Sequence, residues 1–169
     1  MFNCFVSLDE KNLFLFDSNG KRRLFLNFYE IVHVHQMNCF TYIPKFRVYL
    51  VASLDFRLFV FSEYFDLFKT FPVGMHRIQA MHFVEERNEL LICSLDKFII
   101  MNFNANAKYD IAKVAMLDPS GTQINFTLTE KKVIELNMSY IKRMKIENNR
   151  IITWNPSDVS VHLLWDYSM

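Results

Sequence analysis

One stretch decides the fold: Val48-Tyr49-Leu50-Val51-Ala52-Ser53-Leu54-Asp55-Phe56-Arg57-Leu58-Phe59-Val60-Phe61-Ser62. Two apolar runs, at 48–52 and 58–61, flank the turn Ser53-Leu54-Asp55. Runs this short and this rich in Val, Tyr and Phe favour β-strands, whereas a helix would need apolar residues at a 3.6-residue period. Two such strands joined by a tight turn predict an antiparallel hairpin.

The same turn occurs at two other places in the chain, as Ser7-Leu8-Asp9 and Ser94-Leu95-Asp96. Each copy precedes an apolar run, Leu13–Phe16 after the first and Phe98–Met101 after the last. Successive turn serines are 46 and 41 residues apart. These spacings are close to the ~40–45-residue period of a four-stranded propeller blade.

The residues upstream of the turns repeat as well. Cys39–Ile43 precedes a polar turn at Pro44-Lys45, and Ala80–Val84 precedes a polar turn at Glu85–Asn88. In both copies a further strand then leads into the Ser-Leu-Asp turn. We therefore predict an all-β chain of antiparallel meanders, in which no segment has an amphipathic pattern long enough for a helix.

The region after Met101 repeats less regularly. Phe126–Glu130 and Val133–Leu136 predict a strand, a turn and a strand, and Tyr140–Ile146 predicts another strand. Arg150–Trp154 and Val159–Trp165 predict a last hairpin around 155–158. We predict one propeller-type segment over 1–169 with about four blade-like units, placed roughly at 1–30, 31–72, 73–110 and 111–169.

The repeats resemble the WD-repeat family, in which a Ser-x-Asp turn is followed by a strand that ends on Trp-Asp. Trp165-Asp166 is that dipeptide, and it lies nine residues after Ser157. Phe61-Ser62 has the same nine-residue spacing after Ser53, and Phe16-Asp17 stands where a Trp-Asp would be in the first copy. The chain departs from the family in having one true Trp-Asp and few glycines, and Gly74-Met75-His76 is all that matches the family's Gly-His.

The resemblance implies a β-propeller whose turn residues are structural. These are Ser7, Asp9, Ser53, Asp55, Ser94, Asp96, Trp165 and Asp166. An Asp in a tight turn accepts hydrogen bonds from nearby backbone N–H groups. In the family this Asp also joins a buried network with a Ser and a His of the blade. The alternative, a ring of three carboxylates that binds a cation, is less favoured.

The length is short for a WD-repeat ring, which has about seven blades. Four blade-like units would leave an open arc with unpaired strand edges. Three alternatives stay open: a closed four-bladed ring, a part-ring that another copy or another chain completes, and a piece of a longer protein. Residues 3–17 resemble the inner hairpin of a blade with no outer strand before it, which favours the second or third alternative.

The motifs of catalysis and cofactor binding are absent from the sequence. It contains no Gly-x-Ser-x-Gly, and its three glycines form no phosphate-binding loop. His33 and His35 would share one face of a strand, but a zinc site needs three or four ligands. We therefore predict no catalytic residue, no cofactor, no metal site and no small-molecule substrate.

The charges and cysteines indicate the class of protein. Lys and Arg number 19 against 18 Asp and Glu, which argues against binding to nucleic acid or to an anionic membrane. No apolar run approaches the ~18 residues that span a bilayer, and Met1–Glu10 has no basic leader. Cys4, Cys39 and Cys93 are odd in number and far apart, which predicts a reduced, cytoplasmic protein whose cysteines serve as small apolar residues.

Two kinds of surface could bind other proteins. Basic clusters occur at Lys21-Arg22-Arg23 and Lys142–Lys145, although solvated turns would explain them as well. Seven aromatic residues fall within sixteen positions: Phe56, Phe59, Phe61, Tyr64, Phe65, Phe68 and Phe71. Burying all of them requires cover on both faces of a strand, from neighbouring blades or from a partner.

These observations predict a non-catalytic scaffold that binds other proteins, either another propeller-forming chain or a large complex. Tyr49–Lys69 is similar to divergent WD-repeat proteins of cilia and flagella, which implies a cytoskeletal, axonemal setting. The alternatives are an adaptor in trafficking or ubiquitin-ligase complexes and an accessory or regulatory subunit of a multi-subunit enzyme. An independent catalytic module is the least favoured.

Overall fold

The computed structural model describes residues 5–34, 36–74, 77–95, 97–105, 125–135, 143–147, 150–154 and 159–163. The protein is all-β, as the sequence predicts. Its described strands form four antiparallel sheets, and in each sheet the strands lie side by side in chain order. The described residues contain no helix long and apolar enough to cross a membrane.

The sheets follow one another along the chain. The first contains β1 (Phe5–Leu8), β2 (Asn12–Phe16) and β3 (Arg22–Asn27), and the short helix α1 (Phe28–Val32) follows it. The second contains β4 (Met37–Ile43), β5 (Val48–Ser53), β6 (Arg57–Ser62) and β7 (Leu67–Pro72). The third contains β8 (Ala80–Val84), β9 (Glu89–Cys93), β10 (Lys97–Ala105) and β11 (Phe126–Glu135). The fourth contains β12 (Arg143–Glu147), β13 (Arg150–Trp154) and β14 (Val159–Leu163).

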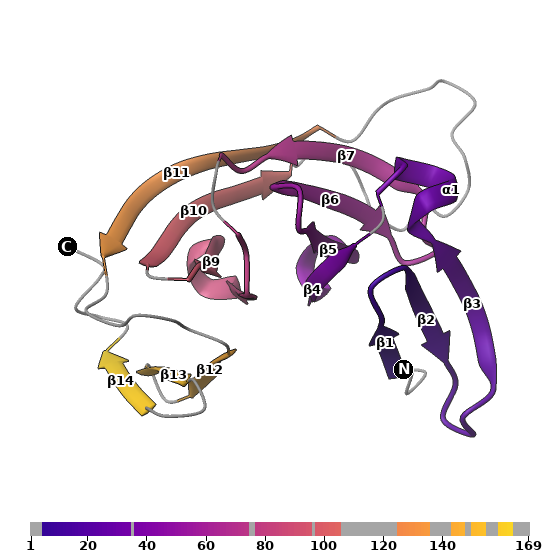
Figure 1. Ribbon diagram of the computed structural model, residues 1–169, viewed down its shortest axis with the longest axis horizontal. Coiled ribbons are helices and arrows are strands. Elements are labelled where there is room, and N and C mark those ends of the chain that lie inside the picture. The colour runs from indigo at the N-terminus through magenta and orange to yellow at the C-terminus, as the bar shows by residue number, and fades with distance from the viewer. Residues whose placement is uncertain are drawn as a thin grey trace.

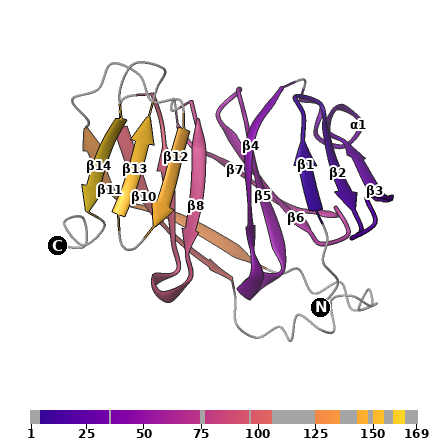
Figure 2. The same ribbon diagram turned by 90° about the horizontal axis from the view of Figure 1, so that it is seen from below.

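The four sheets succeed one another around an open arc (Figures 1 and 2). The first strand of each sheet approaches the first strand of the next, so that β1 meets β4, β4 meets β8, and β8 meets β12. The first sheet lies at one end of the arc and the fourth sheet at the other.

Apolar clusters fill the space between successive sheets. The cluster between the first and second sheets includes Leu13 and Phe59, and the one between the second and third includes Leu50 and Phe103. A smaller cluster joins the third sheet to Ile151 of β13. Side chains alternate along a strand, so that Leu50 of β5 faces the third sheet while its neighbours face the first.

The second and third sheets share one turn design. The 3-10 turns η1 (Pro44–Phe46) and η2 (Glu85–Arg87) join their first two strands. Each turn ends on a residue with left-handed backbone, Arg47 with φ of 51° and Asn88 with φ of 52°. The polar turns predicted at these two places are therefore confirmed.

The structure differs from the sequence prediction in its third sheet. We expected a strand, a turn and a strand in 126–136, but β11 is continuous from Phe126 to Glu135 and pairs with β10 along its length. The residues between the two expected strands, Lys131 and Lys132, lie within β11 instead, where a β-bulge at Ile100/Met101 shifts the register with β10. The third sheet thus takes its fourth strand from beyond residue 110, where we placed a unit boundary.

A short helix occurs where the sequence predicted none. In α1 the Asn27 side chain accepts hydrogen bonds from the N–H groups of Tyr29 at 3.0 Å and Glu30 at 3.4 Å. An Asn at this position satisfies donors that have no partner within the helix. The helix stands directly after β3, where the second and third sheets continue into a fourth strand.

Candidate functional site

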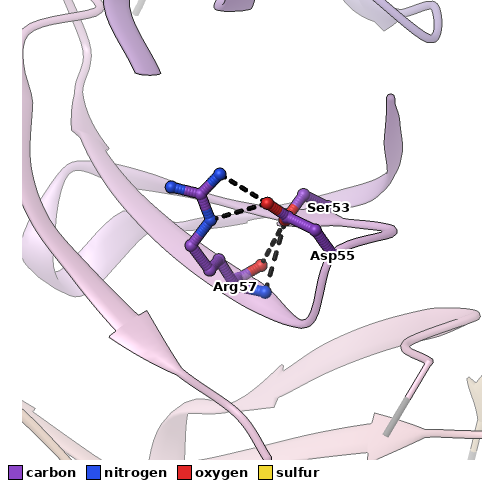
Figure 3. A network of polar contacts seen from close by, with 3 residues as sticks. All are labelled: Ser53, Asp55 and Arg57. Atoms are coloured by element: carbon purple, nitrogen blue, oxygen red, sulfur yellow. Dashed lines mark hydrogen bonds and ion pairs between the residues drawn. The ribbon is translucent and has the colours of Figure 1, made fainter. Parts of the chain in front are cut away.

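The turn between β5 and β6 holds a compact polar network (Figure 3). The Ser53 hydroxyl donates to Asp55 and lies 3.1 Å from the carbonyl oxygen of Arg57. The backbone N–H of Arg57 donates back to Ser53 Oγ at 3.3 Å. Arg57 Nε donates to Asp55 Oδ2 at 2.8 Å, and its Nη2 forms an ion pair with the same oxygen. Ser53 is buried, whereas Asp55 is exposed.

This network sets the protonation of Asp55. Partial burial acts to raise the pKa of its carboxyl, but hydrogen bonds from Arg57 and Ser53 outweigh that effect and hold the pKa below its usual range. The carboxylate is therefore ionised at neutral pH and is engaged within the turn. The predicted structural role of Ser53 and Asp55 fits this geometry, because both side chains close the turn.

The other two Ser-Leu-Asp turns differ from this one. Asp9 Oδ1 accepts from the N–H groups of Lys11 at 2.7 Å and Asn12 at 2.6 Å, while Ser7 is exposed on β1. Ser94 is buried, and its N–H donates to Lys97 O at 2.9 Å. Three predicted turn residues lie outside the described residues: Asp96, Trp165 and Asp166.

The positions matched to Trp-Asp open the next turn in each of the first two sheets. The N–H of Asp17 donates to Lys21 O at 2.9 Å, and the N–H of Ser62 donates to Asp66 O at 2.8 Å. Their side chains accept from the backbone within the same turns, as with Asp17 Oδ1 and the Lys21 N–H at 2.9 Å. The sequence match therefore corresponds to a real structural equivalence between the two sheets.

His33 does not lie on a strand, as the predicted pairing with His35 on one strand face would require. His33 ends α1 with left-handed backbone, φ 53°, and its exposed ring meets Tyr29 edge-on. His35 and His76 lie outside the described residues. Within the described ranges, no three His, Cys, Asp or Glu side chains form a group that could hold a metal ion.

The aromatic-rich segment is mostly buried within the chain itself. Phe59, Phe61 and Phe65 pack in the cluster between the first and second sheets. Phe68 and Phe71 pack against the cluster on the other side. Only Phe56 and Tyr64, both at turns, are exposed. Neighbouring sheets thus supply the cover that the sequence required for most of this segment.

Among the described residues, a different aromatic surface at the end of the arc packs against no second sheet, and its side chains are partly or largely exposed. The cross-strand register puts four aromatic side chains on the side of the first sheet that faces away from the second sheet. We call this surface the terminal aromatic face, and its residues are Phe5, Phe14, Phe16 and Phe25. Phe5 is 63% exposed and Phe25 is 49% exposed. None of the four belongs to the three apolar clusters. The intervening residues, such as Leu13 and Leu26, point into the cluster with the second sheet.

Sequence reasoning missed this face, although a signal was present. In 13–16 every residue is apolar, so that both sides of β2 carry large side chains. A strand at the end of a soluble array usually alternates apolar with polar residues. An all-apolar strand in the first sheet therefore indicates that both of its faces need cover.

A buried carboxylate in the third sheet was also missed. Glu89 is 3% exposed and forms ion pairs with Arg87 at 2.9 Å and Lys131 at 2.5 Å. These contacts tie β9 to the turn before it and to β11. Because both cations are engaged with one carboxylate inside the sheet, we interpret Glu89 as a structural residue.

The basic cluster at Lys21-Arg22-Arg23 is exposed at the start of β3. Arg23 forms an ion pair with Asp17 at 2.8 Å, and the Arg22 guanidinium lies 5.5 Å from the ring centroid of Phe25. Lys142 of the second basic cluster lies outside the described residues.

No protein-family model matches this chain, and no curated protein matches it.

Proposed function

We propose that this chain is a non-catalytic scaffold whose sheets are the blades of an open, WD-repeat-like propeller, and that its terminal aromatic face binds an apolar sheet of another polypeptide. The uncovered aromatic face is the single observation that carries this proposal. The sequential meanders, the contacts between their first strands and the equivalent turns support blade-like units.

The kind of occupant follows from the junctions inside the arc. Both faces of the second sheet are apolar, and each is covered by the face of another antiparallel sheet. The first sheet packs against the second sheet on one side, and the terminal aromatic face is its other side. A further sheet packed on this face would therefore extend the same arrangement. An apolar sheet is therefore the partner that reproduces the packing found on both faces of the second sheet.

The polar residues support a binding role over a catalytic one. Ser53, Asp55 and Arg57 bind one another, and Asp9 binds the backbone of its own turn. Each is engaged in closing a hairpin. The scaffold would thus work through surface complementarity within a larger assembly, and the axonemal setting stays a prediction from the sequence.

Sedimentation velocity on the isolated chain tests this function. In the absence of another partner, a second copy is the polypeptide that can cover the face, so we expect concentration-dependent association. The double variant Phe5→Ser with Phe14→Ser should abolish this association, while its thermal unfolding stays cooperative. The single variant Phe5→Ser alters the more exposed side chain alone and should weaken association without a folding defect.

The matched control replaces two exposed aromatics at turns, Phe56→Ser and Tyr64→Ser. This variant has lost the same kind of side chain from another surface and should associate like the wild type. A wild-type chain that stays monomeric over the whole concentration range would overturn the proposal. Equal association of the face variant and the turn variant would overturn it as well.

A further inference from the structure

The outer edge of β3 differs from the corresponding edges in the middle of the arc. In the second and third sheets the third strand pairs with a fourth strand along its outer edge, whereas in the first sheet β3 is followed by α1. Within the described part of the chain, β3 therefore pairs on one side only, with β2. Figures 1 and 2 show β3 at the margin of the molecule, with α1 close to its end.

The hydrogen-bond ladder shows which backbone groups face that margin. The N–H of Phe28 donates to Lys11 O at 3.0 Å, which fixes a hydrogen-bonded pair next to the Asn12–Asn27 pair. Such pairs alternate along an antiparallel ladder. Leu26 therefore directs its backbone groups toward β2, and Phe25 directs its N–H and C=O toward the outer edge.

Side-chain packing agrees with this assignment. Phe14 and Phe25 are directly opposite in the register, and their ring centroids are 5.5 Å apart. A pair that is not hydrogen-bonded brings opposite side chains closer together than a hydrogen-bonded pair does. The ladder of β2 and β3 thus does not use the backbone N–H of Phe25.

The charge at this edge is basic. Residues 17–27 contain three basic side chains and one acidic side chain. Asp17 is engaged with Arg23, whereas Lys21 and Arg22 are exposed on the approach to the edge. Basic residues next to an open strand would attract an acidic segment, and they would repel the same edge of a second copy.

We propose that the outer edge of β3 binds an extended acidic segment of another protein, which adds to the first sheet as its fourth strand. Main-chain hydrogen bonds at Phe25 would provide affinity, and Lys21 and Arg22 would select acidic side chains. This site uses the edge of the sheet rather than its aromatic face. It therefore does not depend on the scaffold function, and either proposal can fail without the other.

Fluorescence anisotropy with the full chain tests this site. The probe is a fluorescein-labelled peptide of four Glu-Val repeats. The control is a labelled peptide of four Lys-Val repeats, which has the opposite charge. We expect saturable binding of the acidic peptide, at least tenfold tighter than binding of the basic one. The double reversal Lys21→Glu with Arg22→Glu should weaken binding of the acidic peptide at least tenfold.

A pair of variants at one position separates the backbone from the side chain. Phe25→Ala and Phe25→Pro both remove the ring, but only proline removes the N–H that faces the edge. We expect Phe25→Pro to bind the acidic peptide at least tenfold more weakly than Phe25→Ala does. Phe5→Ser, a change on the aromatic face, should leave peptide binding unchanged.

Three outcomes would overturn the proposal. The first is that the wild type shows no saturable binding of the acidic peptide. The basic residues would then serve to prevent other strands from pairing with this edge. The second is equal binding by Phe25→Ala and Phe25→Pro, given that thermal melts show both variants folded. The third is sedimentation that shows the peptide displacing a second copy from this edge, because the occupant would then be the chain itself.

Discussion

Phe14 and Phe25 lie opposite each other on β2 and β3, with ring centroids 5.5 Å apart, on the side of the first sheet that packs against none of the three apolar clusters. Their neighbours Leu13 and Leu26 are buried on the other side of the same strands. One sheet thus carries an apolar surface on each face, and only one of the two is covered by described residues. The proposed scaffold function rests on this asymmetry.

Ser53→Ala should destabilise the fold, because the buried hydroxyl joins Asp55 to the Arg57 backbone. We expect a loss of about 1–2 kcal/mol in the free energy of unfolding, measured by urea denaturation. Ser7→Ala is the matched control, since Ser7 has the same place in its own turn but is exposed. Equal losses in both variants would show that the buried network is not the cause.

The lowered pKa of Asp55 predicts a dependence of stability on pH. A carboxyl whose pKa is lower in the folded state stabilises the fold above its unfolded pKa, whose ordinary value is 3.8, and the stabilisation is lost as the pH falls through the folded pKa. The melting temperature of the wild type should therefore exceed that of Asp55→Asn at pH 7. The difference should shrink below about pH 4 and vanish once both states are protonated.

A gap between wild type and Asp55→Asn that stays constant from pH 7 to strongly acidic pH would contradict this account. Asp9 has its pKa lowered in the same direction, because hydrogen bonds from Asn12 and Lys11 outweigh the effect of burial. The Asp55→Asn variant should therefore keep part of the acid sensitivity of the wild type. The double variant Asp9→Asn with Asp55→Asn should lose more of it.

Glu89→Gln should cost stability because it removes a buried charge from two ion pairs, with Arg87 and Lys131. We expect a loss of about 1–3 kcal/mol, measured by urea denaturation. Glu135→Gln is the control, since Glu135 pairs with Lys97 at 3.4 Å on the same sheet but is 71% exposed. Its loss should stay below about 0.5 kcal/mol. A Glu89 variant as stable as the Glu135 variant would contradict the structural role.

The described cysteines should be unreactive in the folded protein. Burial raises the pKa of Cys93 to about 12, and burial together with the nearby Cys93 raises that of Cys39 to about 12. Their thiolate fraction at pH 8 is then on the order of one in ten thousand. In a Cys4→Ser variant, a disulfide exchange reagent should label both thiols only after unfolding. Rapid labelling of the folded chain would show that one of these strands opens.

The sequence predicts the fold class and most of the strands because the local rules agree with one another. The Ser-Leu-Asp turns, the polar turns at Pro44 and Glu85, and the short Val- and Phe-rich runs all indicate hairpins. Hairpins are local, so that the residues which decide them are adjacent in the chain. The described strands β4 to β6 and β8 to β10 lie where these runs predict them.

Features that depend on distant residues were harder to predict. The local sequence predicts a turn at Lys131-Lys132, and only pairing with the long strand β10 makes these residues part of β11. His33 lies at the end of a helix because Asn27 starts that helix, which no apolar period indicated. The terminal aromatic face depends on which side of the first sheet the rest of the chain covers. That property belongs to the assembled sheets, not to any one strand.

Site-specific photo-cross-linking from residue 14 tests the central claim most directly. Position 14 lies on the middle strand of the first sheet, away from the β3 edge, so that a photoreactive phenylalanine there reports contact with the aromatic face alone. We predict that it forms covalent links between two copies of the chain, and that the same group at Tyr64 forms far fewer. Links from position 14 that are no more frequent than those from position 64 would contradict the claim that this face binds another polypeptide.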